Sequence, residues 1–110
     1  MTLAELMQYL DEHSDYAILD GDPAQTLARA RAGDHRDALA GEILGAIAEH
    51  CGCDDTDAVL ERSEVVAALG PLRLRYMRDD APVAGFRMVE RSIQLVDGAF
   101  NEEALRNRSR

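Results

Sequence analysis

The stretch PVAGFRMVERSIQLVDGAF, residues 82–100, carries the clearest structural pattern of the chain. Five of its apolar residues recur at steps of three and four, which places them on one face of an α-helix. They are Phe86, Val89, Ile93, Val96 and Phe100. The pattern is sustained over two heptads and is typical of a seam along which helices pack. We therefore expect a long helix over Pro82–Asp97 that organises the fold, with its seam facing the protein's own core or a second copy.

Signals for helix ends flank this stretch on both sides. The segment Asp79-Asp80-Ala81-Pro82 is typical of a helix start. Gly98 predicts the end of the helix, and Asn101 predicts the cap of a last short helix that contains Leu105. The polar residues 107–110 are expected to form a frayed tail.

Capping signals predict two helices near the N-terminus. Thr2 and Glu5 have the spacing of a capping box, which precedes an apolar stripe. The stripe consists of Leu3, Leu6, Met7 and Leu10. The segment Asp22-Pro23-Ala24-Gln25 repeats the capping pattern with Pro at the first helical position. It predicts a second helix over Pro23–Ala32, closed by Gly33.

The middle of the chain predicts two more helices. One covers His35–Cys51, with Asp34 as its cap and Gly52 as its stop. The other covers residues 57–69, as one helix or two short ones, because Gly70-Pro71 is a strong stop signal.

Two features of this region allow alternative interpretations. Gly41 and Gly45 lie four residues apart, which favours the close approach of another helix but also weakens the helix that contains them. Leu72–Met77 alternates Leu and Arg as a strand does, yet the same residues suit a helix. We favour the helix because no other segment offers a strand partner.

These patterns together predict an all-α fold, a compact bundle of five to six short helices around the long C-terminal one. The chain has 110 residues, which suits a single domain over residues 1–106. A domain of this size buries about two thirds of its unfolded surface, enough for a modest core.

Composition excludes several classes of protein. The chain has 21 acidic residues against 12 basic ones, all Arg, and a net charge of −9, which argues against direct binding to nucleic acid or to a membrane. No apolar run approaches the roughly 20 residues that a bilayer span needs. Residues 1–10 lack the basic start of a secretory signal, so we expect a cytoplasmic protein.

The charge is distributed unevenly. Residues 1–60 carry 13 acidic residues and three Arg, a net of −10, while residues 61–110 carry eight acidic residues and nine Arg, a net of +1. Ordinary solvation explains such a surface in most proteins. The functional alternative is a surface for a basic protein partner, formed by Asp11, Glu12, Asp15, Asp20 and Asp22.

The basic residues of the second half form one cluster in the sequence. It consists of Arg73, Arg75, Arg78, Arg87 and Arg91. Guanidinium groups pair with carboxylates and with phosphates, so the cluster could contact either. Because the chain is acidic overall, we expect these residues to pair with its acidic half, within one chain or across a dimer.

One local group of side chains suggests chemistry. His50, Cys51 and Cys53 offer an imidazole and two thiols, which are zinc ligands. One residue between the cysteines is closer than the usual spacing, and nearby carboxylates disfavour the thiolate that redox chemistry needs. We therefore expect no cofactor, with zinc as the alternative.

No motif of a hydrolase, nucleotide-binding protein or zinc protease is present in the sequence. We therefore expect a non-enzymatic interaction module, a small adaptor, regulatory or assembly subunit that acts by surface contact. Its partner would be a protein, a basic one if the acidic surface is used, or a second copy. One alternative is an acidic nucleic-acid mimic of the small mobile-element type that inhibits a basic nucleic-acid-binding protein. The other is a zinc or redox protein.

Overall fold

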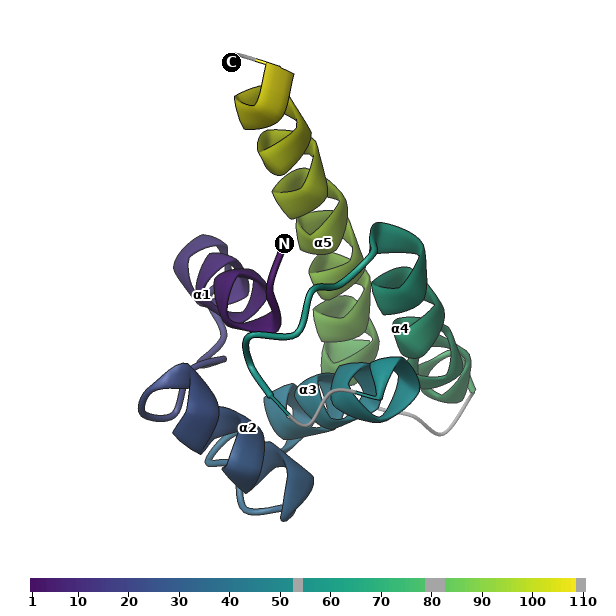
Figure 1. Cartoon of the computed structure of the whole chain (residues 1–110). Helices are drawn as coiled ribbons and strands as arrows, with labels where there is room; N and C mark the ends of the chain where they lie inside the picture. The colour runs from purple at the N-terminus through teal and green to yellow at the C-terminus, as the bar shows by residue number, and fades with distance from the viewer. Residues whose placement is uncertain (53–54, 79–82, 109–110) are drawn as a thin grey trace.

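The fold is all-α, as expected, with five helices and no strand among the residues that the structure describes. This computed structural model describes residues 1–52, 55–78 and 83–108, and the side chains up to residue 106. The helices are α1 (Leu3–His13), α2 (Pro23–Arg31), α3 (Ala38–Cys51), α4 (Arg62–Tyr76) and α5 (Val83–Arg108) (Figure 1).

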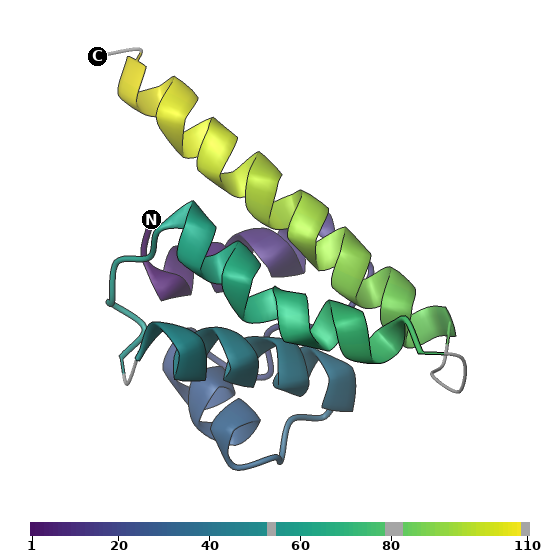
Figure 2. The same ribbon diagram turned by 90° about the vertical axis from the view of Figure 1, so that its right-hand side faces the viewer.

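The C-terminal helix α5 organises the bundle, as the sequence predicts. It packs against α4 and α1, while α3 packs between α4 and α2. Figure 2 shows α3, α4 and α5 as three layers that alternate in direction. The last turns of α5 extend past the other helices, which gives the molecule a long axis of 48 Å against 26 and 25 Å.

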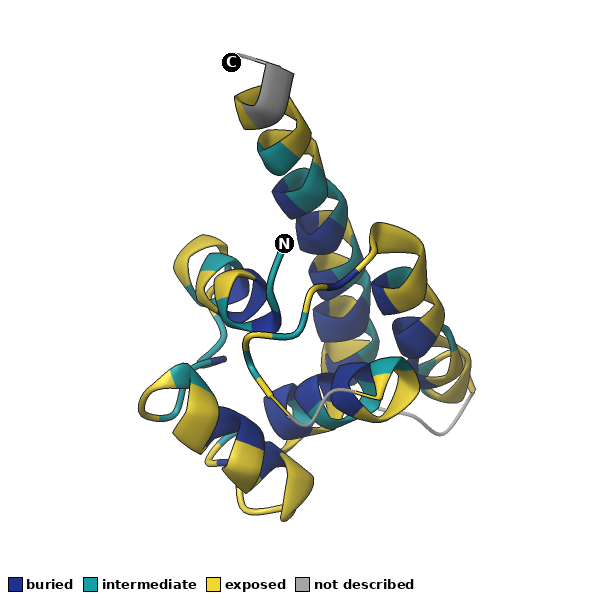
Figure 3. Cartoon of the chain, in the orientation of Figure 1, coloured by how far each residue is buried: buried dark blue, intermediate teal, exposed yellow. Residues whose placement is uncertain are grey.

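The predicted caps of the first two helices are confirmed. Thr2 and Glu5 form a complete capping box at α1, and Asp22 and Gln25 form another at α2. The apolar stripe of α1 is fully buried, on the side of the helix that faces the rest of the molecule (Figure 3). Gly33 and Gly52 adopt the left-handed conformation predicted at the ends of α2 and α3.

The expected start of the third helix is wrong by three residues. The helix begins at Ala38, and its cap is Asp37 rather than Asp34. The reason is His35, which is buried and ties this loop to another. Its Nε2–H donates to the Ile18 carbonyl oxygen at 2.8 Å, and its Nδ1 accepts from the backbone N–H of Asp37 at 3.0 Å. These contacts hold residues 35–37 outside the helix.

The predicted helix over residues 57–69 begins later, at Arg62. The residues before it are extended and pair with the N-terminus. Leu3 N–H donates to the Ala58 carbonyl and Leu60 N–H donates to the Met1 carbonyl, with an isolated bridge between Thr2 and Val59. Backbone pairing with the N-terminus therefore outweighs the local helix signal here.

The predicted stop at Gly70-Pro71 is also wrong, because α4 continues through it to Tyr76. Pro71 cannot donate to the carbonyl of Ala67, but both residues are exposed, so water can solvate that carbonyl. Continuing the helix buries Leu72. It also places the Tyr76 ring against α5. The prediction that residues 72–76 are helical is confirmed.

The predicted break at Gly98 is absent, so no separate last helix begins at Asn101. Gly98 serves close packing instead. A Cβ atom at this position would lie 2.9 Å from the Tyr9 hydroxyl oxygen. The helix continues through residues 107 and 108, and the start signal at residues 79–82 lies outside the described residues.

The predicted seam of α5 faces the protein's own core. Val89 and Val96 are fully buried, while Ile93 and Phe100 are half-buried and pack against the core. Phe86 is also half-buried. The centre of the buried face lies to one side of this seam. It consists of Met88, Val89, Ser92, Leu95, Val96 and Ala99.

Candidate functional site

Three of the five carboxylates predicted to bind a basic partner take part in the fold. Asp22 caps α2, and the Asp11 carboxylate accepts from the backbone N–H of Leu19 at 2.9 Å. Asp20 accepts hydrogen bonds from two Arg residues. Its Oδ2 accepts from Arg29 Nη1 at 2.9 Å and from the backbone N–H of Arg36 at 3.3 Å. Structural roles therefore account for these three residues.

Electrostatics support the structural role of Asp20. Burial pushes the pKa of Asp20 upward, but hydrogen bonds from Arg29 and Arg36 and the charges of both outweigh burial. The net effect is a pKa below the ordinary value. The charged form of Asp20 is thus the one that the fold stabilises.

Glu12 and Asp15 remain exposed. Glu12 lines a hollow of about 370 Å³ between α1 and the projecting end of α5, which Tyr9, His13 and Glu102 also line. Burial raises the pKa of the Tyr9 hydroxyl, and the charge of Glu102 and its hydrogen bond raise it further. The rings of Tyr9 and His13 stack with centroids 4.0 Å apart.

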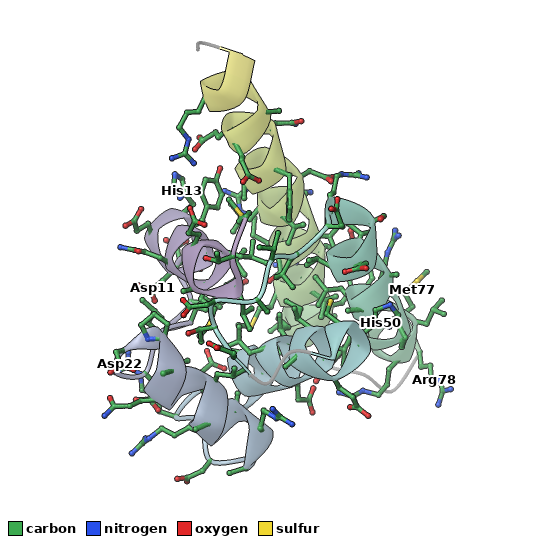
Figure 4. All side chains as sticks on the ribbon, in the orientation of Figure 1. Asp11, His13, Asp22, His50, Met77 and Arg78 are labelled. Carbon is green, nitrogen blue, oxygen red and sulfur yellow. The ribbon has the colours of Figure 1, made fainter. Side chains whose placement is uncertain are left out.

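The group of His50, Cys51 and Cys53 is only partly described. His50 is exposed at the end of α3, Cys51 is half-buried against the core, and Cys53 lies outside the described residues. Within the described part of the chain, no three His, Cys, Asp or Glu side chains are placed to hold a metal ion. Figure 4 shows His50 on the side of the molecule opposite Asp11 and Asp22.

Two members of the Arg cluster pair with carboxylates inside the chain, in line with the interpretation favoured above. Arg73 of α4 pairs with Glu90 of α5, and Arg75 pairs with Glu42 of α3, which belongs to the acidic half. Tyr76 Oη also donates to Glu42 at 2.9 Å. These contacts fix the position of α4 between its neighbours.

Arg78 and Arg87 differ from these two. Both are exposed, and neither forms an ion pair with a described residue. Figure 4 shows Arg78 and its neighbour Met77 pointing away from the helices. Arg91 is exposed and donates to Gln94 at 3.4 Å, a weak contact within α5.

Exposed apolar side chains gather where α4 meets α5. Leu74, Met77 and Val83 are 67%, 58% and 65% exposed, values far above those of the core. Half-buried Phe86 lies one helical turn after Val83. We call these four residues the hairpin patch, since α4 and α5 form a helical hairpin.

Contacts across the hairpin bring the patch together. The Arg73–Glu90 pair joins α4 to α5 two turns into the helix. Nearer the hairpin end, a Cβ atom at Gly85 would lie 2.5 Å from the Tyr76 ring, so the helices touch there. Leu74 and Met77 therefore belong to the same end of the hairpin as the first turn of α5, which carries Val83 and Phe86.

The sequence pattern indicates an exposed Leu74 once the helix is continued past Gly70-Pro71. The expected helix end at Gly70-Pro71 is the reason that the patch was not predicted. In a helix that continues to Tyr76, Leu72 points to the core, and Leu74, two positions on, points away from it. The alternation of Leu and Arg in this segment thus reflects one buried and one exposed Leu.

A hollow of about 460 Å³ lies over α3, between the end of α2 and α4. Its floor is made of small residues, among them Gly41 and Gly45. The charged residues on its α4 side, Glu42 and Arg75, are paired with each other. The residues that line this hollow give no evidence of a ligand site.

No known protein family, curated protein or solved structure matches this chain. Among the described residues, none of the helices combines the length and the apolar character that crossing a membrane requires.

Proposed function

We propose that this chain is a non-enzymatic protein-interaction module whose contact surface is the hairpin patch. One observation carries the proposal. Leu74, Met77 and Val83 are more than half exposed and lie at one end of the α4–α5 hairpin. A cluster of exposed apolar side chains with a polar rim is typical of protein contact sites.

Apolar side chains of this size have a higher free energy in water than in the interior of a protein or an interface. Burying a Leu or Met side chain fully contributes about 1.5–3 kcal/mol. Three such residues at one end of the hairpin therefore offer a partner apolar surface whose burial favours binding. Single exposed apolar residues need no such explanation, as Val59 illustrates, but a cluster does.

The acidic surface is a weaker candidate for the same role. Asp11, Asp20 and Asp22 hold the fold together, which leaves Glu12 and Asp15 of the five predicted carboxylates. Of the five, Glu12, Asp15 and the capping residue Asp22 are exposed. Three exposed carboxylates do not reproduce the regular spacing of phosphates that a nucleic-acid mimic requires.

Affinity capture from the lysate of the source cell tests the proposal when matched variants are compared. The test variant is Leu74→Ser with Met77→Ser, and the control is Glu12→Gln with Asp15→Asn. We expect a stoichiometric protein partner that the control retains and the test variant loses. Retention by the test variant together with loss by the control would instead support the acidic surface.

A further inference from the structure

We propose that the partner segment at the hairpin patch is an acidic amphipathic helix of another protein. This inference rests on the proposed function and adds the chemistry of the partner. The observation behind it is the position of two Arg residues relative to the patch. Arg78 follows Leu74 by four residues, and Arg87 follows Val83 by four residues.

Residues four positions apart on a helix lie on the same side. Arg87 therefore extends the patch along α5. Arg78 lies just beyond the end of α4, beside Met77. Both guanidinium groups are exposed and lack a described carboxylate partner. The patch thus presents an apolar centre with a positive group at the edge of each helix.

The segment that carries the hairpin patch differs in net charge from the rest of the chain. Residues 71–91 contain five Arg and three acidic residues, a net of +2, whereas the rest of the chain has a net of −11. A basic partner would be drawn to the acidic remainder rather than to the patch. Arg73 and Arg75 are paired with Glu90 and Glu42, so Arg78, Arg87 and Arg91 are the cations of this segment that remain for an acidic partner.

A helix is the form of partner that fits the shape. The patch lies across two antiparallel helices, with Leu74 and Met77 on one and Val83 and Phe86 on the other. An amphipathic helix places apolar anchors at positions i, i+3, i+4 and i+7, and such a row packs between two helices. Carboxylates beside those anchors would then meet Arg78 and Arg87.

Two synthetic peptides test the inference in titrations with the full chain. One is an amphipathic helix with Leu on one face and Glu on the other, and the second has Lys in place of Glu. We expect the Glu peptide to bind. Leu74→Ser with Met77→Ser should weaken binding by more than about tenfold, since the burial of two apolar side chains is lost.

Charge is tested separately with a matched pair of substitutions on α5. We expect Arg87→Gln to weaken binding of the Glu peptide by about two- to fivefold, which is the effect of losing one exposed ion pair. Arg106→Gln removes the same charge from the projecting end of the helix and should leave binding unchanged. Equal effects of the two substitutions would overturn the inference, because general charge rather than the patch would then govern binding.

The remaining outcomes separate the inference from the proposed function. If only the Lys peptide binds, and the patch substitutions weaken it, the patch is an interaction site but its partner is not acidic. If neither peptide depends on Leu74 and Met77, both proposals are contradicted. A dimer in sedimentation equilibrium that the patch substitutions dissociate would assign the patch to a second copy and overturn the acidic partner.

Discussion

A Cβ atom built at Gly41 would lie 2.8 Å from the Cβ atom of His35, closer than two such atoms approach in proteins. Gly41 therefore allows the loop before α3 to fold back on the helix and bury His35. Gly45, one turn later, is different. A Cβ atom there meets only the Ala30 carbonyl oxygen, at an ordinary contact distance of 3.9 Å.

These two glycines predict substitutions of opposite sign. Gly41→Ala should lower the free energy of unfolding by about 1–3 kcal/mol, because His35 has to move. Gly45→Ala should raise it by about 0.5–1 kcal/mol, since Ala favours the helix and finds room. Urea unfolding of both variants measures the difference. Stabilisation by Gly41→Ala would show that His35 does not occupy the described position.

Pro71 and Pro23 form a second matched pair. Pro71 lies inside α4, where it removes a backbone hydrogen bond, so Pro71→Ala should raise the free energy of unfolding by about 1–3 kcal/mol. Pro23 lies at the start of α2, where its N–H would be unpaired. Pro23→Ala should lower the free energy of unfolding by about 0.4–1 kcal/mol, because Ala gives the unfolded chain more conformational freedom than Pro does. A loss of stability in Pro71→Ala would contradict a helix that continues through residue 71.

The neutral side chains of His35 and His13 should have opposite tautomers. His35 accepts at Nδ1 from the Asp37 N–H, so its proton is on Nε2. His13 lies 3.0 Å from the Tyr9 carbonyl at Nδ1, and a carbonyl only accepts, so its proton is on Nδ1. Long-range ¹H–¹⁵N correlation spectra recorded at about pH 8 report the tautomers. A His35 proton on Nδ1 would be incompatible with this loop.

The lowered pKa of Asp20 predicts a pH-dependent contribution to stability. Because the pKa is lower in the folded state, the charged form stabilises the fold above the ordinary carboxyl range. That contribution is lost as the pH falls through the lowered value. Asp20→Asn should therefore lower the melting temperature at neutral pH, and the difference should shrink at about pH 2. The exposed Asp15 provides the control, since Asp15→Asn should match the wild type at both pH values.

Local signals in the sequence predict the parts of the fold that local interactions determine. The capping boxes at Thr2 and Asp22 satisfy backbone groups within a few residues, so their spacing suffices to locate two helix starts. The same holds for Gly33 and Gly52 at two helix ends. These elements need no knowledge of the rest of the chain.

The errors arise where contacts between distant residues outweigh a local preference. Gly98 resembles a stop signal, but its lack of a side chain leaves room for the Tyr9 hydroxyl from α1. Pro71 resembles a stop, but burial of Leu72 favours a longer helix. The hairpin patch follows from that longer helix. For this reason the sequence analysis considered the acidic surface as a contact site and did not consider Leu74 and Met77.

Chemical-shift mapping of the ¹⁵N-labelled chain during titration with the Glu peptide tests the central claim most directly. The hairpin patch predicts the largest shifts in residues 74–78 and 83–87, with small changes in residues 11–22. Leu74→Ser with Met77→Ser should abolish them while leaving the rest of the spectrum intact. Largest shifts in residues 11–22 or over the hollow on α3, with residues 74–78 and 83–87 unchanged, would contradict the assignment of the contact surface.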